Sequence, residues 1–161
     1  GYQFAGWYSD SDCIHKVADN AELSISVNSS VHYYAKFVKS STKVMYFDPN
    51  TNWTKNKNER FAAYVYEKST GDGKWYSMTE DASHNCYTFT MDASGKYDMI
   101  IFSRMNGNTT ENSWDNEWNR TPGAHGGKVE GIAIPTDGTN CFVQATGNDG
   151  WDNCGGSWTT K

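Results

Sequence analysis

Leucine is nearly absent from this chain of 161 residues, proline occurs only three times, and no apolar run approaches the ~20 residues of a membrane-spanning helix. Little leucine beside abundant Tyr, Thr, Val and Trp argues against helices and favours β-sheet. Basic residues are also in the minority, because 14 Lys and Arg face 19 Asp and Glu and leave a net charge of −5. Without a basic surface we expect no nucleic-acid partner, and without an apolar span we expect no membrane insertion.

An initiator methionine and a signal peptide are missing as well, since the chain begins with Gly1. We therefore expect a processed or excised piece of a larger protein. The length suits one domain of ordinary size, or one such domain with a small satellite.

Motifs of zinc-binding cysteines are also lacking, because Cys13, Cys86, Cys141 and Cys154 form no CxxC pair and have no suitable Cys/His spacing. Four cysteines allow three disulfide connectivities. The turn sequence GNDG at 147–150 separates Cys141 from Cys154, and a hairpin there would place these two opposite each other. The sequence leaves two alternatives, a Cys141–Cys154 disulfide or free, half-buried thiols.

Aromatic side chains are what the chain has in excess, at 15% of its residues with 7 Trp and 10 Tyr. Trp and Tyr beyond the needs of a core are common on ligand-facing surfaces, because each has an apolar body and a polar handle. The stretch FAAYVYEKSTGDGKWYSM at 61–78 predicts a strand, a turn at 71–73 and a second strand.

This expected hairpin sorts its rings by strand alternation, which sends successive side chains to opposite faces. One face carries Phe61, Ala63 and Val65 and can enter a core, so Tyr64 and Tyr66 share the other face. Trp75 follows the turn closely enough to join the two tyrosines. Three such rings would form a platform for the flat faces of a sugar, unless they are simply packed under a loop.

The rest of the chain predicts an all-β protein, an antiparallel β-sandwich over 43–161 preceded by a small N-terminal β-sheet unit over 1–38. Within the small unit we expect strands at the aromatic opening, at 21–27 and at 31–38. The sandwich strands outside the hairpin are expected at 43–48, 84–91, 97–106, 129–135, 141–146 and 155–160, with 97–106 central and buried. The polar segment 106–127 is expected to be a loop, and no helix is expected.

A calcium loop is suggested by Asp48, Asn50, Asn52 and Glu59, which fit ligand positions of an EF-hand. Trp53, however, occupies the position at which the EF-hand turn needs glycine, and the flanking sequences predict strands. We therefore expect no metal site here.

Catalytic motifs are absent too, since no GxSxG elbow occurs and the four histidines are scattered among polar neighbours. A glycosidase would need two facing carboxylates, and no pair stands out among the acids of the Asn- and Gly-rich loops. We expect no catalytic residue, no cofactor and no enzymatic activity.

The segment NSWDNEWNRT at 112–121 places Trp114 and Trp118 four residues apart, shortly after Arg104 at the end of the apolar strand. These residues could line a sugar cleft. Alternatively, Asp115 or the Asn side chains could hold Arg104 in a clamp with the Trp rings folded over the core. We favour the structural clamp.

Several motifs occur in order over residues 43–160, namely YFDPNTNW, AYVY, WYSM, IIFSRMN, SWDNEWNRT, IAIPTDGTN and GGSW. Their order and spacing resemble the starch-binding modules of carbohydrate-binding family 26 and the related modules of gut-bacterial starch-utilisation proteins. The resemblance covers nearly three quarters of the chain and implies binding of α-glucan without catalysis.

The resemblance also implies site residues, because two tyrosines and one tryptophan of the family stack on consecutive glucose rings. The matching positions here are Tyr64, Tyr66 and Trp75, and we add as secondary candidates Trp53, Lys74 and Trp114. One departure concerns the loop after the hairpin tryptophan, where the family often has Pro-Gly and this chain has Tyr76 and Ser77.

The first 38 residues contain FAGWY and AKF, which resemble the second half of the internalin-B-type repeat of bacterial surface proteins and its divergent relatives. The resemblance implies a small β-rich spacer.

Together these observations predict a non-catalytic module that binds starch, amylose, amylopectin and maltooligosaccharides. We expect it to be a monomeric part of a larger extracellular or cell-surface bacterial protein. The alternatives are a structural spacer or protein-interaction module, or the same fold binding another glycan.

Overall fold

The computed structural model describes residues 2–26, 28–39, 41–56, 58–123, 130–146, 151–152 and 154–161. It confirms the all-β prediction, and no α-helix occurs among these residues. The chain divides into two compact units, an N-terminal unit over Gly1–Ser41 and a main unit over Thr42–Lys161. The described part of the chain also holds no helix with the length and apolarity to span a bilayer.

The N-terminal unit is a three-stranded antiparallel sheet in the order β2–β1–β3. Its strands are β1 (Tyr2–Tyr8), β2 (Lys16–Ala18) and β3 (Tyr34–Lys39). The predicted strand at 21–27 is wrong, because residues 21–26 form no strand and Val27 lies outside the described residues. The alternating side chains of this segment have no apolar layer to pack into, since Ile25 is exposed. The edge of β1 is paired with β2 instead.

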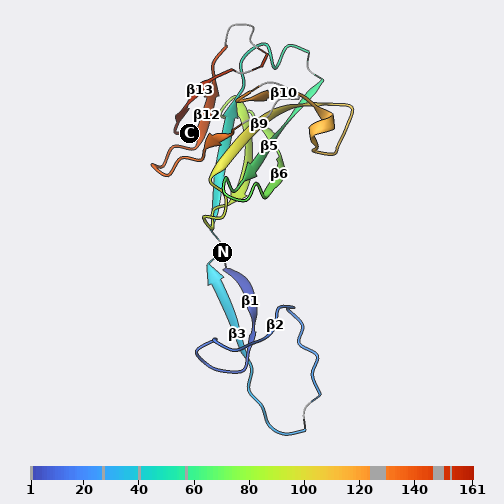
Figure 1. Cartoon of the computed structure of the whole chain (residues 1–161), viewed down its shortest axis with the longest axis vertical. Helices are drawn as coiled ribbons and strands as arrows, with labels where there is room; N and C mark the ends of the chain where they lie inside the picture. Colours follow the sequence, from blue (N-terminus) through green and yellow to red (C-terminus); the bar gives the residue numbers. More distant parts are fainter. Residues whose placement is uncertain are drawn as a thin grey trace. The chain divides into compact units, whose positions relative to one another are not determined.

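The main unit has two sheets (Figure 1). The first has the order β10–β9–β5–β6, with β11 also paired to β9; its strands are β5 (Glu59–Tyr66), β6 (Gly73–Ser77), β9 (Met99–Asn106), β10 (Glu117–Thr121) and β11 (Ile132–Ala133). The second has the order β13–β12–β4–β8–β7; its strands are β4 (Thr42–Asp48), β7 (Thr79–Asp81), β8 (Cys86–Asp92), β12 (Cys141–Gln144) and β13 (Gly156–Thr159). Among the described residues of this unit, the strands pair antiparallel except β12 and β4, which pair in parallel.

The core lies between these two sheets, as in a β-sandwich, and is rich in aromatic rings. Phe47 of β4 stacks on Phe102 of β9 with ring centroids 4.5 Å apart and planes within 6°. Phe142 of β12 stacks on the same Phe102 at 5.6 Å. Because rings of both sheets interdigitate in this way, the core stabilises the sandwich through large buried apolar surfaces.

Strand β9 is the buried central strand that the sequence predicts, with β5 on one side and β10 and β11 on the other. The expected loop at 106–127 is only partly correct, because it contains β10 and a 3₁₀ turn, η1 (Trp114–Asn116). The sequence of β10 looks solvent-exposed because its inward positions are charged. Glu117 and Arg120 are buried and satisfy each other through a 2.6 Å ion pair, so a polar strand can still be covered.

All four cysteines carry free thiols, which excludes the Cys141–Cys154 disulfide in this structure. The turn at 147–150 that would have placed them together lies outside the described residues. Cys154 is instead buried beside Asn50, whose side-chain amide points at its sulfur from 3.6 Å. Burial raises the pKa of the Cys141 thiol to about 11, so this thiol is protonated and unreactive at neutral pH.

Candidate functional site: a four-ring aromatic cluster

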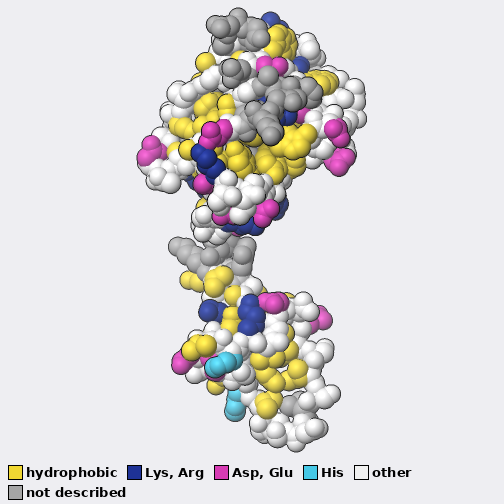
Figure 2. Space-filling view, viewed as in Figure 1, with side chains coloured by type: hydrophobic (Ala, Val, Ile, Leu, Met, Phe, Trp, Pro, Cys, Tyr) yellow, Lys and Arg dark blue, Asp and Glu magenta, His cyan; other side chains and the backbone are white. Residues whose placement is uncertain are grey.

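The predicted hairpin places its three rings together on the outward face of the first sheet. Tyr64 of β5 lies directly opposite Trp75 of β6, and their ring centroids are 5.1 Å apart. Tyr66 follows two residues along β5, and its ring lies 5.8 Å from that of Tyr64. The residues that alternate with them, Ala63 and Val65, are fully buried in the core, so the alternation places the hairpin rings as the sequence predicts. Figure 2 shows apolar side chains gathered at the surface over β5, β6 and β9.

Trp114 of η1 completes the group, which we name the four-ring cluster (Tyr64, Tyr66, Trp75 and Trp114). Its ring centroid lies 4.6 Å from that of Trp75 and 5.0 Å from that of Tyr64. Trp114 remains 37% exposed, while the other three rings are half-buried. A surface with this much accessible aromatic area can stack on a flat, weakly polar ligand.

Two glycines create the space in which the tyrosines lie. A Cβ at Gly73 would be 2.4 Å from Cζ of Tyr64, so the Tyr64 ring covers this first residue of β6. A Cβ at Gly131 would be 2.9 Å from Cε1 of Tyr66, and the backbone N–H of Gly131 donates a 2.7 Å hydrogen bond to the Tyr66 hydroxyl. Each tyrosine thus packs against a glycine of the backbone and stays half-buried.

The Tyr64 hydroxyl is neutral at physiological pH. Burial raises its pKa, and the negative charge of Asp72 raises it further. A neutral phenol both donates and accepts hydrogen bonds, so it can pair with ligand hydroxyls.

The loop before η1 is held by Arg60, which extends from the start of β5. Its Nε donates to the carbonyl oxygen of Thr109 at 2.7 Å, and Nη2 donates to Thr109 Oγ1 at 3.2 Å. Nη1 donates to Oδ1 of Asn112, and Nη2 also donates to the carbonyl of Glu111. The Asn112 amide in turn donates to Ser77 Oγ of β6 at 3.0 Å, so the loop is tied to both strands of the hairpin.

A second arginine lies beneath Trp114. The guanidinium carbon of Arg120 is 4.5 Å from the centre of the Trp114 ring, within the range of a cation–π contact. Glu117 accepts a 2.6 Å hydrogen bond from Arg120 through Oε1 and another 2.6 Å bond from Ser103 through Oε2. Trp114 thus packs on a buried arginine and still keeps 37% of its surface exposed.

The structure removes Trp53 from the ligand-stacking candidates. Its exposed fraction is 0%, its ring stacks on Phe61 at 6.3 Å, and its Nε1 donates to the carbonyl of Trp151 at 2.7 Å. The loop at 48–60 is polar in composition but folds its one large apolar side chain between the sheets. Burying an apolar side chain of this size is much more favourable than leaving it exposed to water.

Lys74 also lies away from the four-ring cluster. It is next to Trp75 on β6 and therefore points to the other face of the strand, where its Nζ is 5.0 Å from the Tyr76 ring. Trp114 is thus the secondary candidate that the structure brings to the cluster. The signal for it in the sequence was the Asn- and Asp-flanked tryptophan pair.

The predicted arginine clamp is present, and an Asn side chain of the 112–121 segment, Asn119, is one of its partners as expected. Arg104 Nε donates to the carbonyl of Trp53 at 2.8 Å, and Nη1 donates to Oδ1 of Asn119 at 3.2 Å. Its charge is balanced by Glu59 at 3.6 Å, not by Asp115. The guanidinium lies 4.7 Å from the Trp118 ring centre, so Trp118 belongs to the clamp and not to the four-ring cluster.

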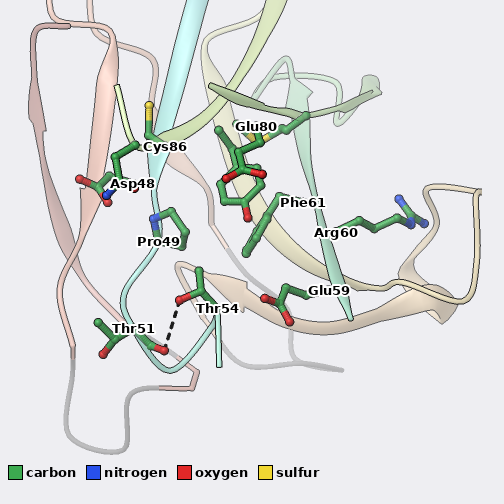
Figure 3. Close-up of a pocket in the computed structure, with 12 residues that line it drawn as sticks. Asp48, Pro49, Thr51, Thr54, Glu59, Arg60, Phe61, Glu80 and Cys86 are labelled. Carbon is green, nitrogen blue, oxygen red and sulfur yellow. Dashed lines mark hydrogen bonds between the residues drawn. The ribbon is translucent and has the colours of Figure 1, made fainter. Parts of the chain in front are cut away.

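A separate cavity of about 700 Å³ opens at one edge between the sheets (Figure 3). Its walls include the carboxylates of Asp48, Glu59 and Glu80. Burial, and next the charges of Glu80 and Glu59, raise the pKa of Tyr87 at its wall. Figure 3 shows the Arg60 side chain pointing away from these carboxylates, and the buried carboxylate of Glu59 is paired with Arg104 instead. None of the four rings lines this cavity.

The calcium-like positions at 48–59 serve the fold. Asn50 Oδ1 accepts hydrogen bonds from the backbone N–H groups of Asn52 and Trp53 at 3.0 and 3.3 Å, as in an Asx turn. Its amide donates to the carbonyl of Ala145 at 3.1 Å. Within the described ranges, no group of three or more His, Cys, Asp or Glu residues could hold a metal ion.

Comparison of the chain with protein-family models, with curated proteins and with solved structures gives no match.

Proposed function

We propose that this chain is a non-catalytic module that binds starch-like α-1,4-glucan, including maltooligosaccharides, on a secreted or cell-surface bacterial protein. The single observation that supports this most is the four-ring cluster. Three of its rings are those for which the resemblance to starch-binding modules implies stacking on glucose, and these three rings cluster on one outward face.

The physical basis of binding would be stacking of apolar sugar faces on the rings, with hydroxyl groups at the rim forming hydrogen bonds. The Tyr64 hydroxyl, the Tyr66 hydroxyl and the turn around Asp72 offer such polar partners. Each contact is modest, so we expect a Kd of roughly tens to hundreds of micromolar for a short oligosaccharide. Several modules on one starch granule would raise retention without new contacts.

The test is calorimetric titration with maltoheptaose of the native chain, of Trp75→Ala and of Tyr2→Ala. Tyr2 is a matched control because it is an exposed aromatic residue of the N-terminal unit, outside the cluster. We expect saturable heat for the native chain and for Tyr2→Ala, and loss of at least tenfold in affinity for Trp75→Ala. No heat from the native chain with any maltooligosaccharide would refute the proposal.

A spacer or protein-interaction module is the second candidate, and one observation favours it. The N-terminal unit exposes large apolar side chains, among them Ile14 and Phe37. Exposed apolar surface of this kind is typical of protein–protein contacts. A glycan panel separates the candidates, because a spacer binds no sugar, whereas a module for another glycan binds a different member of the panel.

A further inference from the structure

The ring of Trp114 differs from the other three in how it is placed. Tyr64, Tyr66 and Trp75 belong to the β5–β6 hairpin, so strand register fixes their spacing. Trp114 comes from the loop between β9 and β10, where no register applies. Its position depends on side chains that tie this loop down.

Arg60 is the main tie between the loop and the hairpin. Its three nitrogen atoms make four hydrogen bonds to three residues of the loop, namely Thr109, Glu111 and Asn112. A lysine has a single nitrogen at the end of a flexible stem and cannot reproduce this fork. Arg120 supports the other side by packing under the Trp114 ring.

The result is a bent surface. The planes of Tyr64 and Tyr66 differ by 25°, whereas Trp75 is tilted by 55° to Tyr64. Trp114 is tilted by 65° to Tyr64 and by 60° to Trp75, so it stands as a wall beside these two rings. A flat, ribbon-like chain can stack on rings whose planes are nearly parallel. A chain that turns from one sugar to the next can follow rings that are tilted to each other.

We infer that the Trp114 wall makes the site selective for a curved glucan over a flat one, and that Arg60 is the residue that positions the wall. This inference rests on the proposed function, because it assigns a specificity determinant to the same site. Trp114 would touch the ligand through the exposed part of its ring, while Arg60 would act only through the loop.

The experiment measures affinity for maltoheptaose, a curved chain, and for cellohexaose, a flat one. The proteins are the native chain, Trp114→Ala, Arg60→Ala, Arg60→Lys and the double variant that combines Trp114→Ala with Arg60→Ala. Lys55→Ala is the control for loss of an exposed cation. We expect Trp114→Ala to lose about tenfold for maltoheptaose, roughly one stacking contact, with cellohexaose unchanged. Arg60→Ala should lose a similar factor, Arg60→Lys should not restore it, and the double variant should lose no more than Trp114→Ala.

The lack of additivity is the decisive readout, because an arginine with a merely structural role would weaken the double variant further. Asn112→Ala provides a milder disturbance of the same tie if Arg60→Ala does not fold, and it should shift the affinity ratio in the same direction. Full maltoheptaose affinity in Trp114→Ala, or an increase, would overturn the inference while leaving the proposed function intact. A native chain that binds neither sugar would overturn both.

Discussion

Aromatic rings gather on both faces of strand β5, and the two groups of rings differ in how deeply they are buried. On the inner side, Trp53 and Phe61 stack within 12°, and the nearby Phe47 and Phe102 stack within 6°. On the outer side, the four rings are half-exposed, and Trp75 and Trp114 are tilted by 60°. Tilted pairs also occur between the sheets, since Phe47 is tilted by 65° to Trp53 and by 62° to Phe61, so the two faces differ in burial and not in ring angle. The same residue types therefore form a core on one face and a candidate binding surface on the other.

The largest expected effect is on the free energy of unfolding, which should fall much more when an inner ring is removed than when an outer ring is removed. Trp53→Ala should lower the free energy of unfolding by about 3–5 kcal/mol, because it leaves a cavity in a closed core. Trp75→Ala should lower it by only about 1 kcal/mol, because its ring is half-exposed. Chemical denaturation of both variants measures the contrast. Equal losses would mean that the outer rings are as important for the fold as the inner ones.

An intermediate effect is expected from the glycine beneath Tyr64. Gly73→Ala introduces a methyl group 2.4 Å from Cζ of Tyr64, so the ring must move and the outer surface changes shape. We expect a loss of about 1–3 kcal/mol in stability together with weaker glucan binding. Gly155→Ala is the control, since no heavy atom lies within 4 Å of its new methyl group. Unchanged binding by Gly73→Ala would show that the Tyr64 ring position is unimportant.

The smallest effect concerns stability at alkaline pH. Burial raises the pKa of Tyr64 on the outer face and of Tyr87 at the cavity wall above their ordinary value of about 10. Each group therefore contributes stability that is fully present below pH 10 and is lost as pH rises, because the unfolded chain releases its proton first.

Tyr64→Phe and Tyr87→Phe should each reduce this alkaline loss, and thermal melts between pH 8 and about 11 measure it. Only Tyr64→Phe should alter maltoheptaose binding, since Tyr87 lies outside the four-ring cluster. A Tyr87→Phe variant with altered binding would instead point to the cavity as part of the site.

The prediction of the fold from sequence worked best where local pattern and burial agree. The alternation in 61–66 placed Tyr64 and Tyr66 on one face, and the apolar run at 97–106 became the buried β9. It failed for the strand at 21–27, whose alternating side chains have no layer to enter. It also failed for β10, because the buried pair Glu117 and Arg120 gives that strand the composition of a loop.

The candidate site shows the same division. Strand periodicity and turn chemistry, both local properties, were enough to specify the all-β fold and to place Tyr64, Tyr66 and Trp75 together. The orientation of Lys74 follows from the same strand alternation. The burial of Trp53 and the arrival of Trp114 at the cluster were settled by folding in three dimensions. Each depends on partners far away in the chain, such as Trp151 for Trp53 and Arg60 for the Trp114 loop. No local pattern encodes such contacts, because they form only when the two sheets pack and Arg60 meets the loop between β9 and β10.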